Sequence, residues 1–284
     1  MSDNLSQLME HPEPFIVLPT TTHTHTVVLL HGLSTNGVSF GTDFMENALN
    51  AKGSTLPRAF PYVKFIFPSG APRRCTAFGG KMMHVWFDIT TIADRTIGED
   101  KQIEGLAEST AYLSRLIREE TTILELVGRS REDLVLGGFS QGCAMSMWVL
   151  LNMGLELGGY VGMSGWLPFR RQIDSVMKVG TDQKARSLAA LDYMRDTVPV
   201  PCLSHCPTSE RLKGLATHVF LGHGSKDEKV RTAWGEDMRD TLEILGLDIV
   251  WKEYEALEHW YKVPDEVEDI SDFLRSAFLH EVIS

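Results

Sequence analysis

A glycine-flanked serine is the residue of this chain with the clearest chemical potential. Ser140 lies in the pattern Gly-x-Ser-x-Gly, directly after the apolar run 134–137 and before a helix-forming segment. A strand that reverses into a helix within about two residues strains its turn residue, and Gly138 and Gly142 remove the Cβ atoms that would collide there. The pattern therefore predicts a hydroxyl held at the carboxyl edge of a sheet, beside helix N–H groups that stabilise an anion. This is the environment of a nucleophile.

A nucleophilic serine needs a base within hydrogen-bond reach and a carboxylate that orients the base. At such a turn of an α/β sheet, the chain order is Ser140, then the acid, then a histidine, on loops after later strands. Asp227 follows an apolar strand pattern and is the predicted acid, with Glu228 as its nearest rival. Of the two downstream histidines, His259 directly follows the last predicted strand, whereas His280 falls near the end of the terminal helix. We therefore predict His259 as the base.

Acyl transfer also needs two N–H donors aimed at the oxyanion. One is expected from the backbone of Gln141, the residue after the nucleophile. The other is expected from Leu33, in the loop that follows an early strand. His31 and His223 lie at strand ends, and we interpret them as hydrogen-bonding residues that shape their loops.

Composition excludes several classes of function. The chain has 284 residues, of which 43% are hydrophobic and 23% charged, and its formal net charge is -11. This acidic balance disfavours nucleic acid or an anionic membrane as the main partner, because phosphate binding needs clustered Lys and Arg. No run approaches the ~18 apolar residues of a membrane span, and residues 1–10 lack the pattern of a signal peptide. We expect a cytoplasmic protein with no stable membrane insertion.

The cysteines give weak support for a metal site. Cys202 and Cys206 flank His205, but there is no second pair at zinc-ligand spacing. Free thiols in an irregular loop are the prediction there, and Cys143, after the nucleophile, is predicted as a small core residue. We predict no metal and no cofactor.

Strand and helix patterns alternate along the chain, which predicts an α/β fold with a mostly parallel, doubly wound sheet in a single domain over residues 1–284. Strands are expected at 15–18, 26–30, 63–67, 134–137, 159–163, 217–221 and 248–254, and helices at 101–127, after Ser140, near 182–196, at 230–245 and from about 264. The irregular stretch at about 169–214 precedes the acid-bearing strand and is predicted to be an insert that forms a flap over the site.

Several motifs together resemble the phospholipase/carboxylesterase family, which includes the acyl-protein thioesterases. The motifs are His31-Gly32-Leu33, Pro68-Ser69-Gly70-Ala71-Pro72, Trp86-Phe87-Asp88-Ile89, Gly138-Phe139-Ser140-Gln141-Gly142, Trp166-Leu167-Pro168 after Ser164, His223-Gly224 to Asp227, and His259. The resemblance runs from about Thr26 to Phe278 apart from the insert. It implies an α/β-hydrolase fold, a triad of Ser140, Asp227 and His259, and hydrolysis of fatty acyl esters or thioesters. The chain departs from the family pattern at Ser34-Thr35-Asn36-Gly37 and at Glu258 before the histidine.

These observations predict a serine hydrolase that cleaves carboxylic esters or thioesters through an acyl-enzyme. The expected substrate is a small acyl ester or an acylated protein, with apolar contacts from Trp86, Trp166, Leu167 and the insert. One alternative is a small-ester carboxylesterase or lysophospholipase, and another is a non-catalytic binding module on the same fold. The protein is expected to be a monomer or a homodimer, with no nucleic-acid partner.

Overall fold

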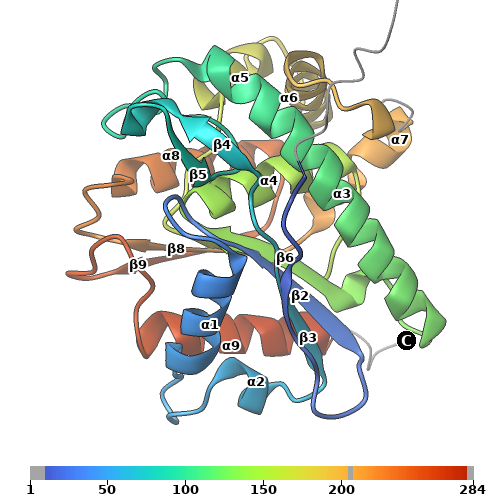
Figure 1. Ribbon diagram of the computed structural model, residues 1–284. Helices are drawn as coiled ribbons and strands as arrows, with labels where there is room; N and C mark the ends of the chain where they lie inside the picture. Colours follow the sequence, from blue (N-terminus) through green and yellow to red (C-terminus); the bar gives the residue numbers. More distant parts are fainter. Residues whose placement is uncertain (1–9, 204–206, 280–284) are drawn as a thin grey trace, which may run out of the picture.

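The computed structural model describes residues 10–203 and 207–279 and shows a central sheet with helices packed on it (Figure 1). Within these residues seven strands hydrogen-bond in the order β1-β3-β2-β6-β7-β8-β9. Their bounds are β1 Phe15–Val17, β2 His25–Leu30, β3 Val63–Phe67, β6 Leu134–Phe139, β7 Gly159–Met163, β8 Val219–Gly224 and β9 Ile249–Tyr254. β1 runs antiparallel to β3, and the other neighbouring pairs are parallel. The predicted α/β-hydrolase fold with a mostly parallel sheet is confirmed.

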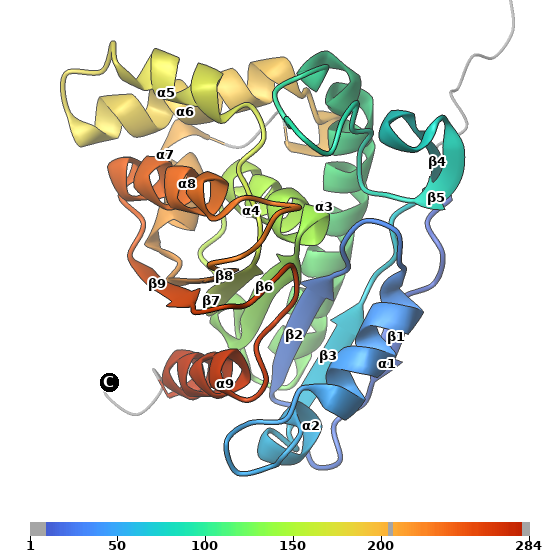
Figure 2. The same cartoon turned by 90° about the vertical axis from the view of Figure 1, so that its left-hand side faces the viewer.

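Helices cover both faces of the sheet (Figure 2). One face carries α1 (Gly37–Asn47) and α9 (Asp265–Phe278), with the short α2 (Leu56–Ala59) at its edge, and the other carries α3 (Ile103–Leu126), α4 (Gln141–Met153) and α8 (Thr232–Leu245). The strands read as continuous apolar runs because alternate residues serve different cores. In β2, Val27 and Leu29 pack in the core under α1 and α9, whereas Val28 and Leu30 pack in the core under α4.

The strand order places a topological switch point beside the serine. From β2 the chain crosses to β3 on one side, whereas β6, on the other side of β2, leads on to β7 and β8. Loops that leave the carboxyl ends of β2 and β6 therefore diverge in opposite directions. In open α/β sheets this switch point is where ligands bind. The two loops are the ones that carry Leu33 and Ser140.

Most predicted elements lie within two residues of the observed ones, and the strands 63–67 and 159–163 have the predicted bounds. The prediction missed α1 and a small antiparallel hairpin of β4 (Pro72–Cys75) and β5 (Lys81–His84). α1 contains Gly37 and Gly41, and glycine lowers helix propensity. A Cβ at Gly37 would lie 2.1 Å from the carbonyl oxygen of Phe67, so close packing on β3 requires glycine at that position.

The predicted insert folds largely into helices. α5 (Arg170–Met177) and α6 (Gln183–Thr197) pack against each other and against α8, and α6 also contacts α4. The short α7 (Thr208–Arg211) follows before β8. The sequence predicted one helix here, and α5 was missed. The insert thus adds an outer helical layer, whose first residues come near the carboxyl edge of the sheet.

Candidate active site

The backbone at Ser140 is strained as the sequence predicts. Ser140 has φ 56° and ψ -118°, outside the helical and extended regions, and lies between the end of β6 and the start of α4. An ideal Cβ at Gly138 would lie 2.5 Å from the carbonyl carbon of Gly142, and one at Gly142 would lie 2.3 Å from the carbonyl oxygen of Leu30. Both flanking glycines are therefore required by close backbone approach. A non-glycine residue in this conformation marks a candidate functional site.

The structure brings the three predicted triad residues together. The Ser140 Oγ and His259 Nε2 atoms are 2.9 Å apart, and His259 Nδ1 lies 2.6 Å from Asp227 Oδ2. Because the carboxylate only accepts, His259 donates through Nδ1 and presents Nε2 as the acceptor for the serine hydroxyl. The rival acid, Glu228, is exposed, and so is Glu258 beside the histidine. His280 lies outside the described residues.

The Asp227 carboxylate is buried and saturated with donors. Its Oδ1 accepts from the N–H groups of Lys229 and Val230 at 2.9 and 2.8 Å. Burial works to raise its pKa, but hydrogen bonds from His223 and His259, the charge of His259 and the Val230 amide lower that pKa well below its usual range. His223 Nε2 donates to the Val230 carbonyl at 2.8 Å and lies 3.5 Å from Asp227. The acid is therefore ionised at neutral pH, between two imidazoles.

The two predicted oxyanion donors lie on loops that meet at Ser140. Gln141 is the first residue of α4, where a backbone N–H has no partner within the helix. The loop of Leu33 lies against the nucleophile, since an ideal Cβ on Gly32 would be 3.2 Å from the Ser140 Cβ and 2.9 Å from the Phe139 ring. Ser34, next in this loop, has φ 69°. The geometry brings the loop to the serine, and the donor roles of Leu33 and Gln141 stay predictions.

Buried side chains hold the oxyanion loop. The His31 ring accepts at Nε2 from the Gly70 N–H at 2.9 Å and donates from Nδ1 to the Gly32 carbonyl at 2.7 Å. Burial lowers the pKa of His31 to about 4, so the ring is neutral. The Trp86 indole donates to the His31 carbonyl at 2.9 Å. This confirms the interpretation of His31 as a residue that shapes its loop.

The Gln141 side chain contributes a contact that sequence reasoning missed. Its Oε1 accepts from the Trp86 N–H at 3.2 Å, and its Nε2 donates to the Phe87 carbonyl at 2.7 Å. This glutamine therefore joins the start of α4 to the segment that supports the oxyanion loop. Its position directly after the nucleophile marks Gln141 as a residue of the site. The sequence does not indicate, however, that its side chain bonds to residues about 55 positions away.

The predicted substrate contacts fall into two groups. Trp86 is fully buried and supports the oxyanion loop, so the geometry gives it a structural role. Trp166 and Leu167 lie after β7 and line a cleft of about 70 Å³ together with Arg95 and Trp234. That cleft is far smaller than the ~300–1,000 Å³ of most ligand pockets. Substrate contacts by these three predicted residues stay predictions.

Comparisons with known proteins agree with this geometry. The sequence profile of the phospholipase/carboxylesterase family matches residues 11–184, more than half of the chain. The chain belongs to this family. It is 30% identical to acyl-protein thioesterase 1 of Yarrowia lipolytica over 93% of its own length and 96% of that protein. It is 26% identical to acyl-protein thioesterase 1 of Saccharomyces cerevisiae, with 89% and 92% of the two chains covered.

Solved structures support the same assignment. The crystal structure of Zea mays acyl-protein thioesterase 2 superposes with a TM-score of 0.64 at 25% identity, covering 93% of this chain and 98% of the other. The phospholipase/carboxylesterase family assignment makes this chain a hydrolase of acyl esters or thioesters.

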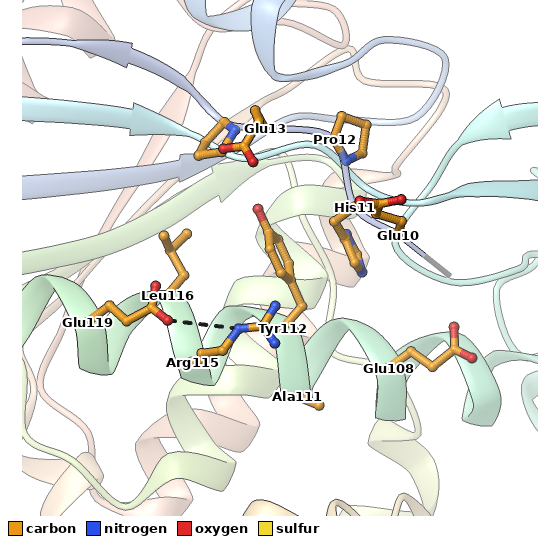
Figure 3. Close-up of a pocket in the computed structure, with 11 residues that line it drawn as sticks. Glu10, His11, Pro12, Glu13, Glu108, Ala111, Tyr112, Arg115, Leu116 and Glu119 are labelled. Carbon is orange, nitrogen blue, oxygen red and sulfur yellow. Dashed lines mark ion pairs between the residues drawn. The ribbon is translucent and has the colours of Figure 1, made fainter. Parts of the chain in front are cut away.

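A separate cavity of about 630 Å³ lies between the N-terminal segment and α3 (Figure 3). It is lined by none of the three predicted triad residues. Its wall is tied to the oxyanion loop all the same. His11 stacks on Tyr112 with ring centroids 3.9 Å apart, and its Nδ1 lies 2.9 Å from the Ser69 carbonyl oxygen. The Ser69 hydroxyl in turn accepts from the Gly37 N–H at 3.0 Å.

Two further features of the described residues concern metal binding and membrane crossing. In the part of the chain that the structure describes, no group of three or more His, Cys, Asp or Glu side chains could hold a metal ion. Of the candidate clip, His205 and Cys206 lie outside the described residues. Cys143 is buried on α4, as predicted. Across residues 10–203 and 207–279, no helix combines the length and the apolar character that crossing a bilayer requires.

Proposed function

We propose that this hydrolase cleaves acyl thioesters and esters by a two-step serine mechanism, with Ser140, Asp227 and His259 as the catalytic residues. The single observation that carries the proposal is the continuous hydrogen-bonded path from Ser140 to His259 to Asp227, at 2.9 and 2.6 Å. The first distance falls within the range in which a nucleophile and its base exchange a proton, and the second lets the carboxylate orient the base. The strained backbone at Ser140 and the first turn of α4 supply the setting.

In the first step, His259 Nε2 takes the proton from the Ser140 hydroxyl as the oxygen attacks the acyl carbonyl. The backbone N–H groups of Leu33 and Gln141 hold the oxyanion, each contributing ~3 kcal/mol to transition-state stabilisation. The imidazolium then gives its proton to the leaving thiol or alcohol, and an acyl-serine remains. Asp227, already ionised, stabilises the imidazolium and fixes the tautomer that keeps Nε2 free to accept.

In the second step, His259 removes a proton from water, which attacks the acyl-serine. The tetrahedral intermediate collapses when His259 returns the proton to Ser140, and the carboxylic acid leaves. The same donors serve both steps, because the oxyanion forms at the same position twice. The resting enzyme is thereby restored without any cofactor in the scheme.

The proposed substrate class is an acyl thioester, including an S-acylated protein. The curated relatives named above are acyl-protein thioesterases, and the alignments cover 92% or more of their lengths. The half-exposed Trp260, which follows the catalytic base and packs edge-on against Phe139 at 5.0 Å, offers an apolar surface beside the serine. An acyl chain or an apolar leaving group fits such a surface.

Turnover of p-nitrophenyl butyrate and of butyryl and palmitoyl thioesters tests the proposal, together with labelling by a fluorophosphonate. We expect wild-type protein to be labelled and active, and Ser140→Ala to be neither. A folded wild-type protein without turnover or labelling would contradict the serine mechanism. A kcat/KM that favours oxygen esters over matched thioesters would instead support a small-ester carboxylesterase or lysophospholipase.

A further inference from the structure

Arg95 is a buried arginine beside the acid-bearing loop. It lies between β5 and α3 and is 8% exposed. Its guanidinium lies 4.9 Å from the ring centre of Trp166 and 5.9 Å from that of Trp234. Over the described ranges 10–203 and 207–279 it forms no ion pair, and its Nε has no hydrogen-bond partner. Burying a cation in this way is costly, so its presence calls for a role.

The polar contacts of Arg95 lead to the acid. Its Nη2 donates to the Lys229 carbonyl at 3.3 Å, and its Nη1 donates to the Thr91 carbonyl at 3.0 Å. Lys229 is the residue whose own N–H donates to Asp227 at 2.9 Å. Arg95 therefore holds one end of the peptide segment that positions the carboxylate. Its own backbone is fixed by Gln102, whose side chain donates to the Arg95 carbonyl at 3.2 Å.

The charge of Arg95 also acts on the acid. Burial lowers the pKa of Arg95 to about 10, against the opposing influence of Cys75 and Asp227, so the side chain stays cationic at neutral pH. Seen from the acid, His223, His259 and the Lys229 and Val230 amides surround the carboxylate, and Arg95 adds a cation at the Lys229 carbonyl of the same loop. A nearby cation favours the charged form of a carboxylate.

We propose that Arg95 is a positioning residue for hydrolysis, which fixes the loop of Asp227 through the Lys229 carbonyl and places a cation on that loop. The proposal rests on the serine mechanism above. In this proposal the planar guanidinium positions the loop through its hydrogen bonds, and its positive charge influences the protonation of the Asp227–His259 pair. Arg95 makes no contact with the Ser140 hydroxyl among the described residues, so the positioning role predicts a fall in kcat. Its guanidinium does lie over Trp166, a predicted substrate contact, and a rise in KM with unchanged kcat would therefore contradict the positioning role.

Two variants separate the effect of the planar guanidinium geometry from the effect of the positive charge. Arg95→Met removes both, whereas Arg95→Lys keeps the charge and loses the planar fork. Arg231 supplies a matched control, because its guanidinium lies 5.9 Å from the same Trp234 ring but is exposed. The measurements are kcat and KM for p-nitrophenyl butyrate from pH 5 to pH 9, with thermal melting as the check on folding.

For Arg95→Met we expect kcat to fall about thirtyfold with KM within about twofold of wild type, because a misplaced acid loop degrades the transition state and leaves ground-state binding intact. Without the cation the Asp227–His259 pair takes up a proton more readily. The acidic limb of the kcat/KM profile should therefore move to higher pH by about half a unit. Arg95→Lys should lose kcat about fivefold and keep the limb in place, and Arg231→Met should match wild type.

The proposal is overturned if folded Arg95→Met keeps wild-type kcat and an unshifted profile. It is also overturned if both Arg95 variants lose the same activity with no movement of the limb, since that result describes structural support alone. If Arg95→Met fails to fold, Arg95→Lys decides: unchanged kcat overturns the fork role. An inactive, unlabelled wild type would overturn the serine mechanism itself. An active wild type whose activity is matched by Arg95→Met would overturn only the role of Arg95.

Discussion

The two sides of Ser140 are held by different chemistry. On the oxyanion side the contacts are neutral: the His31 ring, the Ser69 hydroxyl and the Gln141 amide each bond to backbone groups. On the acid side the contacts involve charged groups: the Asp227 carboxylate lies between two imidazoles, and the Arg95 guanidinium donates to the Lys229 carbonyl of the same loop. A site that receives a transient oxyanion works best with fixed, neutral dipoles, whereas a side that must stabilise an imidazolium needs a standing negative charge.

This contrast has a measurable consequence. Neutral hydrogen bonds do not titrate between pH 5 and pH 9, so damage to the oxyanion side should lower the rate at every pH by a similar factor. Damage to the acid side should change both the rate and its pH dependence. Variants on the two sides can therefore be told apart by the shape of the pH profile, independently of how much activity is lost.

The largest effect is expected from Asp227→Asn. The Asn oxygen can still accept from the Lys229 and Val230 amides, but its NH₂ then faces His259. His259 would have to accept at Nδ1 and carry its proton at Nε2, which faces the serine hydroxyl, so the base is lost. We expect kcat to fall ~10⁴-fold with little change in melting temperature. Steady-state kinetics with p-nitrophenyl butyrate checks this.

The matched control is Glu228→Gln, the exposed carboxylate next in the chain. Wild-type activity in that variant, with a large loss in Asp227→Asn, assigns the acid to Asp227. Equal losses in the two variants would show that the loop and not the carboxylate matters, and would break the comparison.

On the oxyanion side the largest effect is expected from Gly32→Ala. The added Cβ would lie 2.9 Å from the Phe139 ring and 3.2 Å from the Ser140 Cβ, so the loop must shift away from the serine. Removing one oxyanion donor costs about 10²–10³-fold in kcat. We expect a loss near the lower end of that range and a pH profile of wild-type shape. A shifted acidic limb would contradict the neutral character of this side.

The convergence of the three proposed catalytic residues could be predicted from sequence because their positions follow chain order. Ser140 directly follows β6, whereas Asp227 and His259 lie three and five residues after the ends of β8 and β9, and the ends of parallel strands meet at one edge of the sheet. The supports could not be predicted in this way. Arg95 donates to the Lys229 carbonyl, 134 positions away, and the Gln141 side chain donates to the Phe87 carbonyl, 54 positions away. No periodic pattern in the sequence connects these partners. Such contacts exist only after the layers have packed.

Beneath the acid side, Glu266 makes stability depend on pH. It is fully buried at the start of α9, its carboxylate faces Gly222 of β8, and burial raises its pKa to about 8. In the unfolded chain the same group titrates near pH ~4.3. The folded form binds the proton more tightly, so the stabilisation is complete below the unfolded pKa and is lost as pH rises through about 8.

Glu266→Gln should remove this dependence. The amide oxygen can still accept from the Lys262 N–H, which the wild-type carboxylate does at 2.8 Å. We expect the variant to exceed wild type in free energy of unfolding by about 2 kcal/mol at pH 8.5, with the gap closing toward pH 5. Urea unfolding at both pH values measures it, and Glu46→Gln, an exposed carboxylate on α1, is the control. A gap that widens at acidic pH would reverse the sign and refute the argument.

The smallest expected effect comes from Ser69→Ala on the oxyanion side. Ser69 is almost fully buried, and its hydroxyl accepts from the Gly37 N–H at 3.0 Å, where the oxyanion loop enters α1. The variant leaves that N–H without its acceptor, which costs ~1 kcal/mol, and we expect a fall in kcat of about fivefold with an unchanged pH profile. Ser39→Ala, an exposed serine on the same helix, should match wild type. The backbone carbonyl of Ser69 also accepts a hydrogen bond from His11, and Ser69→Ala keeps this contact. An unaltered rate in Ser69→Ala would therefore mean that the His11 and His31 contacts hold the loop without the hydroxyl.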